Sequence, residues 1–425
     1  MTAAAAPTLP DLFRVFLRIG LLSFGGPAAQ ISLMHRTLVD ETGWLEEKQF
    51  LNALSFCMLL PGPEAMQLAT YSGWRLHGVA GGLIAGLLFV LPGAAVIFAL
   101  AAVYAMLGDV PLVASLFLGV KAAVLIIVIE ALLRVSRKAL SAPSHWAIAV
   151  LAFIGLFFLA LPYPLIVAAA AIYGAVFGTR WVSPPHTQAR IETSARGTAG
   201  TVALWLAIWL VPIAVMDAVL GTSILGDIGA FFSKLAVVTF GGAYAVLAYM
   251  AQEVVADYGW LTAGEMMDGL GLAETTPGPL ILVTQFVGFL AAFREGGLGY
   301  GLAGGVVALW ATFAPCFLWI FAGAPYIEWI SAQRRLSGAL SGITAAVVGV
   351  IANLSLWFAL HVFFAEVTRE SAGILTLWTP TLSTLDWRVP VLALLAGVLL
   401  LRVGLGLGWV LGVASLAGLA LSALG

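Results

Sequence analysis

Apolar stretches long enough to cross a membrane follow one another along almost the whole chain. Of the 425 residues, 62% are hydrophobic and only 9% are charged. A soluble protein of this length needs far more charged side chains to cover its surface. A membrane-spanning helix needs roughly 20 apolar residues, and stretches near that length recur here without the alternation of a β-barrel. We therefore predict an all-α protein that crosses the membrane many times.

The apolar segments form two matching sets with one extra segment between them. Because one stretch in each set is divided into two short pieces, we expect about 10–13 membrane segments. The first set lies near 12–34, 50–74, 78–108, 111–135, 146–161 and 164–178, the extra segment near 202–222, and the second set near 228–250, 267–291, 299–325, 337–363, 389–401 and 404–424.

Short motifs of glycine, proline and tryptophan repeat at a constant offset of 216 residues. The pairs are Ser23-Phe24-Gly25-Gly26 with Thr239-Phe240-Gly241-Gly242, Gly43-Trp44-Leu45 with Gly259-Trp260-Leu261, and Pro61-Gly62-Pro63 with Pro277-Gly278-Pro279. Beyond a seven-residue insertion the offset becomes 223, where Pro92 matches Pro315 and Gly119 matches Gly342. Such ungapped matches indicate an internal duplication. We divide the chain into a first repeat, 1–179, a cytoplasmic linker, 180–201, a connecting transmembrane helix, 202–226, and a second repeat, 227–425.

The positions of the cationic side chains predict the orientation of the repeats. Arg137 lies just after the fourth segment, Arg334 lies just before the equivalent segment of the second repeat, and Arg190 lies in the linker. If all three are cytoplasmic, the equivalent helices run in opposite directions. Two inverted repeats with helices broken by glycine and proline are typical of secondary transporters, which hold their substrate between the repeats.

The Phe-Gly-Gly and Pro-Gly-Pro motifs are the first candidates for a binding site. Glycine pairs and prolines inside an apolar helix release backbone groups that lipid cannot satisfy. A helix that restarts after such a break presents N–H groups and a positive dipole end, which suits an oxyanion. The alternative is simple kinking or close helix packing through small residues. Since both motifs recur in both halves, we favour a substrate site.

Polar and cationic side chains near these breaks complete the predicted site. Lys121 lies deep in the fourth segment, where a cation is costly and is expected to face a partner or a cavity. Gln67 and Gln285 follow the two Pro-Gly-Pro motifs and carry amide donors, with helix–helix hydrogen bonding as the alternative. The predicted substrate-binding residues are Ser23, Phe24, Gly25, Gly26, Pro61, Gly62, Pro63, Gln67, Lys121, Thr239, Gly241, Gly242, Thr276, Pro277, Gly278, Pro279 and Gln285.

Five further charged residues are candidates for electrostatic or coupling roles. Arg18 and Lys234 are repeat equivalents before the Phe-Gly-Gly motifs, and each could instead extend to the membrane interface. Glu64, Glu130 and Glu274 are carboxylates that could carry a proton, or could simply form salt bridges. Glu130 would then pair with Lys121 or Arg134, although Lys121 is nine residues away and does not meet it on one helix.

The sequence lacks the motifs of other function classes. Cys57 and Cys316 both lie in apolar segments, and the chain has no metal-ligand spacing, so neither a metal nor a cofactor is expected. No nucleotide-binding motif is present, and no nucleic acid is expected as a partner. An intramembrane enzyme using Glu64, Glu130 or Glu274 remains a less favoured alternative, because no paired catalytic motif supports it.

The ordered double set of motifs resembles the chromate ion transporter family, in its long form with two fused domains. The resemblance is carried by 21–27, Trp44-Leu45, 59–63 with Gln67, 239–242, 259–261 and 276–279 with Gln285. It covers essentially the whole chain. One departure is Ala243, which stands where the first half has Pro27, so the two halves need not do the same job.

The resemblance implies a multi-pass protein of the bacterial inner membrane that exports chromate from the cytoplasm and confers chromate resistance. The expected driving force is the proton motive force or the membrane potential, with protons as the candidate coupling ion. Because chromate is a tetrahedral dianion like sulfate, sulfate or another small anion is the alternative substrate. A homodimer is left open.

Overall fold

The computed structural model describes residues 7–108, 110–178, 194–220, 223–240, 243–331 and 333–423. Helices dominate these residues, and they fall into two compact units. The first unit comprises Met1–Ala102, Ser183–Ala243 and Thr276–Ser337, and the second comprises Val103–Val182, Tyr244–Thr275 and Gly338–Gly425. Each unit therefore draws on both halves of the sequence.

The first unit is built from the broken helices at the start of each half. Its helices are α1 (Leu9–Leu22), α2 (Gly26–His35), α3 (Glu47–Cys57), most of α4 (Glu64–Leu107), α8 (Ala195–Leu220), α9 (Ile224–Val238), α12 (Val283–Gly323) and α13 (Ile327–Ser331). A π-helical turn, Arg36–Glu41, extends α2, and a 3-10 turn, Leu280–Leu282, precedes α12. The imidazole of His35, at the end of α2, lies 2.6 Å from a carboxylate oxygen of Glu47, at the start of α3.

Both long helices of the first unit double back on themselves. In α4 the backbone leaves helical geometry at His77 and Gly78, and a Cβ placed on Gly73 would lie 2.2 Å from the carbonyl oxygen of Gly81. In a straight helix, residues eight apart are separated by about 12 Å. The same turn occurs in α12 at Gly296 and Gly297. Each of these helices is therefore a hairpin of two arms, which agrees with the separate apolar segments that the sequence predicts there.

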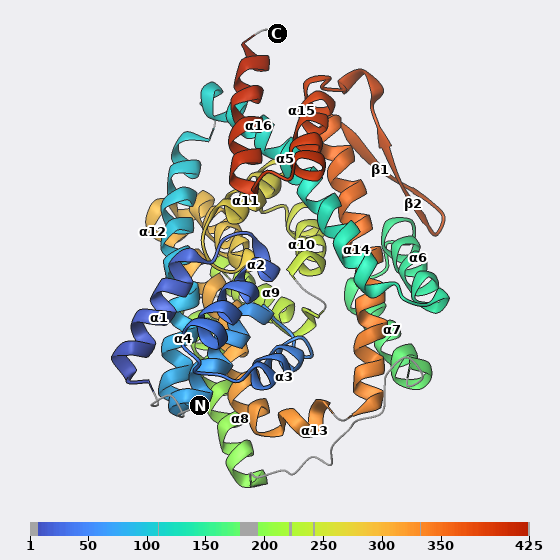
Figure 1. Ribbon diagram of the computed structural model, residues 1–425. Helices are drawn as coiled ribbons and strands as arrows, with labels where there is room; N and C mark the ends of the chain where they lie inside the picture. The colour runs from blue at the N-terminus through green and yellow to red at the C-terminus, as the bar shows by residue number, and fades with distance from the viewer. Residues whose placement is uncertain are drawn as a thin grey trace. The chain divides into compact units, whose positions relative to one another are not determined.

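The second unit is organised around α5 (Pro111–Ala139), which contacts α11 (Ala263–Thr275), α15 (Arg388–Gly397) and α16 (Leu407–Ser422). A Cβ on Gly119 would lie 1.9 Å from the carbonyl oxygen of Ala414, so the backbones of α5 and α16 touch at a point where only glycine fits. Figure 1 shows α15 and α16 beside α5. The other helices of this unit are α6 (Pro143–Phe157), α7 (Tyr163–Phe177), α10 (Ala243–Gln252) and α14 (Arg334–Phe363).

A short β-hairpin interrupts the helices of the second unit. Strands β1 (Val367–Ala372) and β2 (Leu375–Pro380) pair antiparallel, from Val367 opposite Pro380 to Ala372 opposite Leu375. Figure 1 shows this hairpin beside α14. Asp386 follows the hairpin and accepts two hydrogen bonds from the guanidinium of Arg388, which holds the pKa of this carboxyl below its ordinary value.

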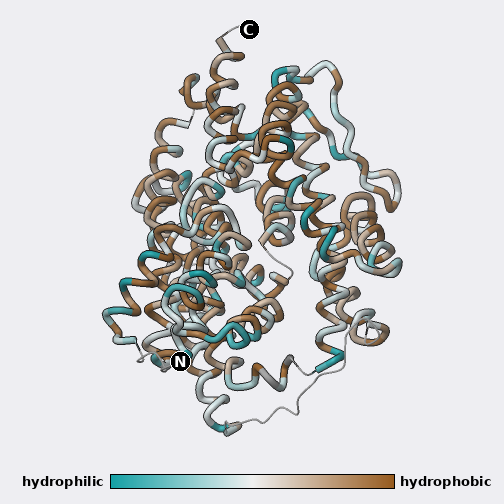
Figure 2. The backbone as a smooth tube through the Cα atoms, viewed as in Figure 1, coloured by the Kyte–Doolittle hydropathy of each residue, from teal (hydrophilic) through white to brown (hydrophobic). Residues whose placement is uncertain are grey.

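The protein is an all-α polytopic membrane protein, as the composition predicts. Among the described residues, five helical stretches have the length and apolarity to cross a membrane. Their bounds are Glu64–Leu107, Pro111–Ala139, Ala195–Val219, Leu280–Tyr326 and Arg334–Phe363. Figure 2 shows the helices coloured mainly hydrophobic, with hydrophilic colour in short patches.

Local backbone features recur at the repeat offset. The π-helical turn after α2 has a counterpart, Glu253–Asp257, after α10. Gly43 and Gly259 both adopt a left-handed backbone, with φ of 61° and 62°. Gly62 and Gly278, at the centres of the Pro-Gly-Pro motifs, do the same, with φ of 113° and 95°. The duplicated motifs therefore share their backbone geometry as well as their residues.

Candidate functional site

The first helix break lies between α1 and α2. Helix α1 ends at Leu22, and the buried Ser23 donates its hydroxyl to the carbonyl of Ile19. Gly25 and Gly26 then take left-handed backbone conformations, with φ of 83° and 77°. Glycine has no Cβ and adopts these φ values without strain, so the chain can turn sharply and begin α2 immediately. The carbonyl of Ser23 is left without a helical donor.

The second break repeats this arrangement between α9 and α10. Helix α9 ends at Val238, and the buried Thr239 donates its hydroxyl to the carbonyl of Leu235, as Ser23 does to Ile19. Its carbonyl is likewise released from the helix. Gly241 and Gly242, which complete the predicted motif, lie outside the described residues.

Each Pro-Gly-Pro loop supplies the donor that the break of the other half lacks. The N–H of Gly62 donates to the carbonyl of Thr239 over 2.9 Å. The N–H of Gly278 donates to the carbonyl of Ser23 over 2.8 Å. These are the same contact made twice, with the halves exchanged. Each half therefore gives the other half the same hydrogen bond that it receives.

The Gly62 loop leaves no space for a side chain. A Cβ on Gly62 would lie 2.9 Å from Nε2 of Gln67 and 3.0 Å from the sulfur of Cys316. The left-handed φ of this residue disfavours any other amino acid as well. Both the loop geometry and its surroundings therefore select glycine.

Glutamine side chains donate to backbone carbonyls of the Pro-Gly-Pro loops, of the first break and of α4. Gln67 donates to the carbonyl of Pro61 over 2.6 Å, and Gln285 donates to the carbonyl of Ala94 over 2.8 Å. Gln30, which was not predicted from the sequence, donates to the carbonyl of Gly278 over 2.6 Å and also to that of Ser23. The amide oxygens of all three side chains are buried and have no hydrogen-bond partner among the described residues. Gln67 and Gln285, which were predicted to donate to an anion, thus each donate one side-chain N–H to a backbone carbonyl.

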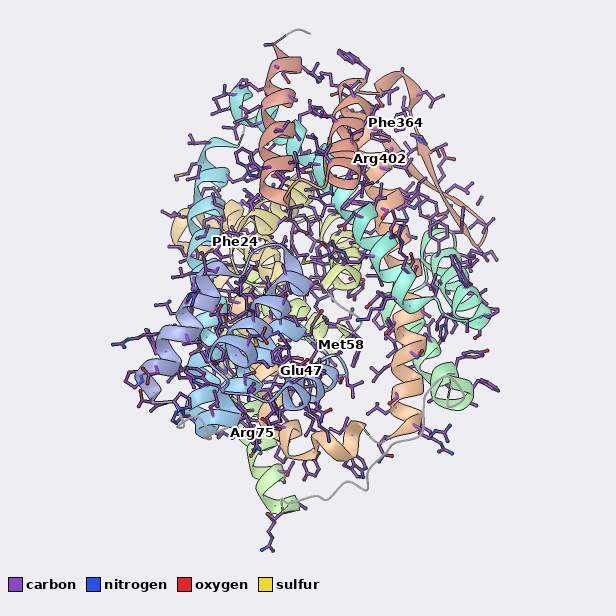
Figure 3. All side chains as sticks on the ribbon, in the orientation of Figure 1. Phe24, Glu47, Met58, Arg75, Phe364 and Arg402 are labelled. Carbon is purple, nitrogen blue, oxygen red and sulfur yellow. The ribbon has the colours of Figure 1, made fainter. Side chains whose placement is uncertain are left out.

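We call the two Pro-Gly-Pro loops, 61–63 and 277–279, the crossed loops, because each contacts the break of the other half. Two helix N-termini lie in the same unit as these loops. Helix α2 begins at Gly26 and α4 begins at Glu64, directly after the two breaks of the first half. The first N–H groups of a helix have no intrahelical acceptor, and they carry the positive end of the dipole. The carboxylate of Glu64 lies in the first turn of α4, where it suits that dipole. Figure 3 labels Phe24 at the first break and Met58 at the end of α3; both side chains are exposed.

The structure also places the remaining predicted residues of the first unit. Thr276 is buried beside the second Pro-Gly-Pro motif. Arg18 is exposed and forms a surface ion pair with Glu41 over 3.5 Å. Lys234 is exposed on α9. The two cations before the breaks therefore point outward in this unit rather than into its core.

Lys121 belongs to the second unit, where it meets a buried carboxylate. Its ammonium on α5 lies 3.3 Å from Oδ2 of Asp268 on α11. The hydroxyl of Tyr104 donates to the same oxygen over 2.7 Å. Lys121 was predicted from the sequence, whereas Asp268 and Tyr104 were not. An acidic residue within an apolar stretch was the signal that could have identified Asp268.

The predicted carboxylates Glu130 and Glu274 have partners as well. Glu130 pairs with Arg134 one helical turn away on α5, which is one of the two partners that the sequence allowed. Glu274, at the end of α11, accepts a hydrogen bond from the hydroxyl of Tyr244 over 2.8 Å. Among the described residues, no group of three or more His, Cys, Asp or Glu side chains is arranged to hold a metal ion.

Comparison with known proteins identifies the relatives of this chain. A family model described as "Chromate transporter" matches residues 10–175 and 226–419. A chromate transport protein of Pseudomonas aeruginosa is 34% identical over 88% of this chain and 86% of its own length. A probable chromate transport protein of Synechococcus elongatus is 31% identical, over 82% of this chain and 84% of its own length. A chromate transport protein of Cupriavidus metallidurans is 32% identical over 81% of both chains. No solved structure matches.

Proposed function

Because the chain belongs to the chromate transporter family, we propose that it exports chromate from the bacterial cytoplasm across the inner membrane. The family makes it a transporter rather than an enzyme, which sets aside the intramembrane-enzyme alternative. Its many apolar helices make it a multi-pass membrane protein. Direction, driving force and binding site are the parts that we propose.

The observation that carries the proposed site is the reciprocal crossing of the breaks. Gly62 and Gly278 each donate to the break of the other half, so the two repeats meet at their least regular backbone. Irregular backbone at membrane depth is tolerated where it is buried in protein or lines a cavity. The starts of α2 and α4 offer N–H groups there, and an oxyanion accepts such donors well. We place the chromate site at these loops, and we propose Lys121, in the second unit, as a separate cationic contact for the anion.

The membrane potential supplies a driving force for export. A chromate dianion carries two negative charges from a negative interior to the outside. Each charge gains about 2.3 kcal/mol per 100 mV, so the dianion gains about 4.6 kcal/mol per 100 mV. Export then needs no energy source on this chain. This potential is one component of the proton motive force, which we propose as the driving force in the wider sense.

The experiment compares chromate flux in proteoliposomes made with the wild type, Lys121→Ala and Lys138→Ala. Lys138 lies on the same helix but is exposed near its end. Loss of an ammonium that contacts the anion costs on the order of 1.4 kcal/mol or more, about ten-fold in apparent affinity. We expect this loss for Lys121→Ala and none for Lys138→Ala, with both variants inserted normally.

Wild-type liposomes that carry no chromate would refute the proposed substrate. Flux of sulfate without flux of chromate would identify the alternative anion. If Lys121→Ala transports chromate as well as the wild type, Lys121 is not part of the route.

A further inference from the structure

Asp268 is a buried carboxylate whose hydrogen bonds are incomplete. The residue is 3% exposed. Its Oδ2 receives the ammonium of Lys121 and the hydroxyl of Tyr104, while Oδ1 is buried and has no hydrogen-bond partner among the described residues. An ionised carboxylate in such surroundings depends on its cation, because burial of an unpaired charge is costly. A proton on this carboxyl would remove the charge.

Lys121 is the more accessible partner of the pair. Its side chain is 27% exposed, against 4% for the side chain of Asp268. A Cβ on Gly264 would lie 3.1 Å from the ammonium nitrogen, so a glycine in the first turn of α11 makes room for this cation. The N-terminus of a helix also carries positive charge. The carboxylate of Glu265 already occupies this N-terminus, at Thr262, so the ammonium of Lys121 is the cation that a further anion would contact.

Neither member of this ion pair has a charged counterpart in the internal repeat. At the offset of 216 residues the counterpart of Asp268 is Asn52, and at the offset of 223 the counterpart of Lys121 is Thr344. Both counterparts are neutral. The charges at Lys121 and Asp268 are therefore particular to one half of the chain, as a role that the other half does not share would require.

We propose that Asp268 is the resident counter-anion of Lys121, displaced when the transported oxyanion binds and neutralised by one proton. This inference rests on the proposed function and deepens it. In the empty state the ammonium and the carboxylate pair with each other. When the oxyanion approaches, a proton from the aqueous phase bonds to a carboxylate oxygen of Asp268, and the ammonium turns its N–H donors to the oxyanion. On release the proton returns to water and the pair forms again.

Charge balance explains why the proton accompanies the anion. Without the proton, the ion pair and a dianion would place two net negative charges in a poorly solvated site. With it, one negative charge remains. One proton and one dianion then leave together as a net single negative charge, which an inside-negative potential still drives outward.

The groups facing Asp268 are few. Lys121 on α5 and Tyr104 on α4 contact it, and Glu265 on its own helix acts through space. Glu265 is engaged with the backbone N–H and the hydroxyl of Thr262, at 2.8 and 2.9 Å. Helix α16, which also contacts α11, carries no titratable side chain.

The test measures equilibrium binding of radiolabelled chromate to the purified full-length protein in detergent, from mildly acidic to mildly alkaline pH. In the wild type, apparent affinity should fall as pH rises, by up to about ten-fold per pH unit for one linked proton. In Asp268→Asn, which is permanently neutral, affinity should stay high across this range. The protonation of chromate itself affects both proteins equally and cancels in the comparison. Asp386→Asn, which alters an ion pair outside the membrane segments, should bind as the wild type does.

Two further variants keep the test decisive. Asp268→Glu retains a carboxylate and should retain the pH dependence. The double variant Lys121→Gln/Asp268→Asn leaves no unpaired buried charge, so it should fold even if Asp268→Asn does not, and it should lose both tight binding and the pH dependence. An unchanged pH dependence in Asp268→Asn or in the double variant overturns the inference. If the wild type transports chromate in that case, only this inference fails; if it transports none, the proposed function fails too.

Discussion

At the scale of single residues, the crossed loops depend on glycines in backbone conformations that other residues adopt only with strain. Gly62 combines a φ of 113° with close neighbours on its side-chain face. Gly43 has a φ of 61° but open space around the position of a Cβ. A comparison of substitutions at Gly62 and Gly43 therefore separates the free-energy cost of the backbone conformation from that of a steric clash.

We predict that Gly62→Ala destabilises the protein more than Gly43→Ala does. The left-handed backbone costs roughly 1–2 kcal/mol at either position. At Gly62 the added methyl must also displace Gln67 or Cys316, an overpacking cost of about 1–3 kcal/mol. Thermal unfolding of the two purified variants measures the difference. Equal losses of stability would show that the Gly62 loop can relax around the methyl group.

The sequence predicted which glycines and prolines break the helices but not what they contact. Duplication of Pro61-Gly62-Pro63 was visible because the motif repeats at a fixed offset. The crossing of Gly62 with Thr239, far away in the chain, has no local pattern. Gln30 was missed for the same reason, since a single glutamine in an apolar segment gives no indication of its acceptor. Asp268 could have been predicted as a functional residue, because acidic residues in apolar segments are rare.

At the scale of helices, glycine decides how closely two backbones approach. Helices α5 and α16 touch at Gly119, where a Cβ would lie 1.9 Å from the carbonyl of Ala414. Gly412, on α16, has open space where its Cβ would be. The sequence identified Gly119 as a repeat position, paired with Gly342, but not as a contact with α16.

We predict that Gly119→Ala lowers the unfolding temperature while Gly412→Ala leaves it unchanged or raises it. The first change forces α5 and α16 apart and costs about 1–3 kcal/mol. The second replaces glycine by alanine within a helix, which stabilises by roughly 0.5–1 kcal/mol. Thermal unfolding of both variants in the same detergent is the measurement. A loss of stability in both would mean that glycine in α16 matters for reasons other than the contact at Gly119.

At the scale of the whole molecule, the two repeats are interleaved rather than separate. Hydropathy predicted the helical membrane class and most segment boundaries, including the turns inside α4 and α12. It did not predict that each compact unit draws on both repeats, because contacts between distant segments leave no periodic signal. The inverted orientation of the repeats, inferred from a few cations, stays a prediction.

We predict that Gly43 and Gly259 lie on opposite sides of the membrane. They are repeat equivalents, both exposed and both in open space, so a cysteine at either position can be labelled. Single cysteines are introduced after Cys57 and Cys316, both buried, are replaced by serine. A membrane-impermeant thiol reagent should label one variant in intact cells and the other only in inverted vesicles. Labelling of both from the same side would show parallel rather than inverted repeats.

We propose that chromate binds where each Pro-Gly-Pro loop crosses the helix break of the other half. The most direct measurement is an experimental structure with chromate present, with the anion located by the anomalous scattering of chromium. We predict a chromium peak beside Gly62 and Gly278, with chromate oxygens within hydrogen-bond distance of backbone N–H groups at the start of α2 or α4. Chromium bound elsewhere in the chain, with none at the crossed loops, would contradict it.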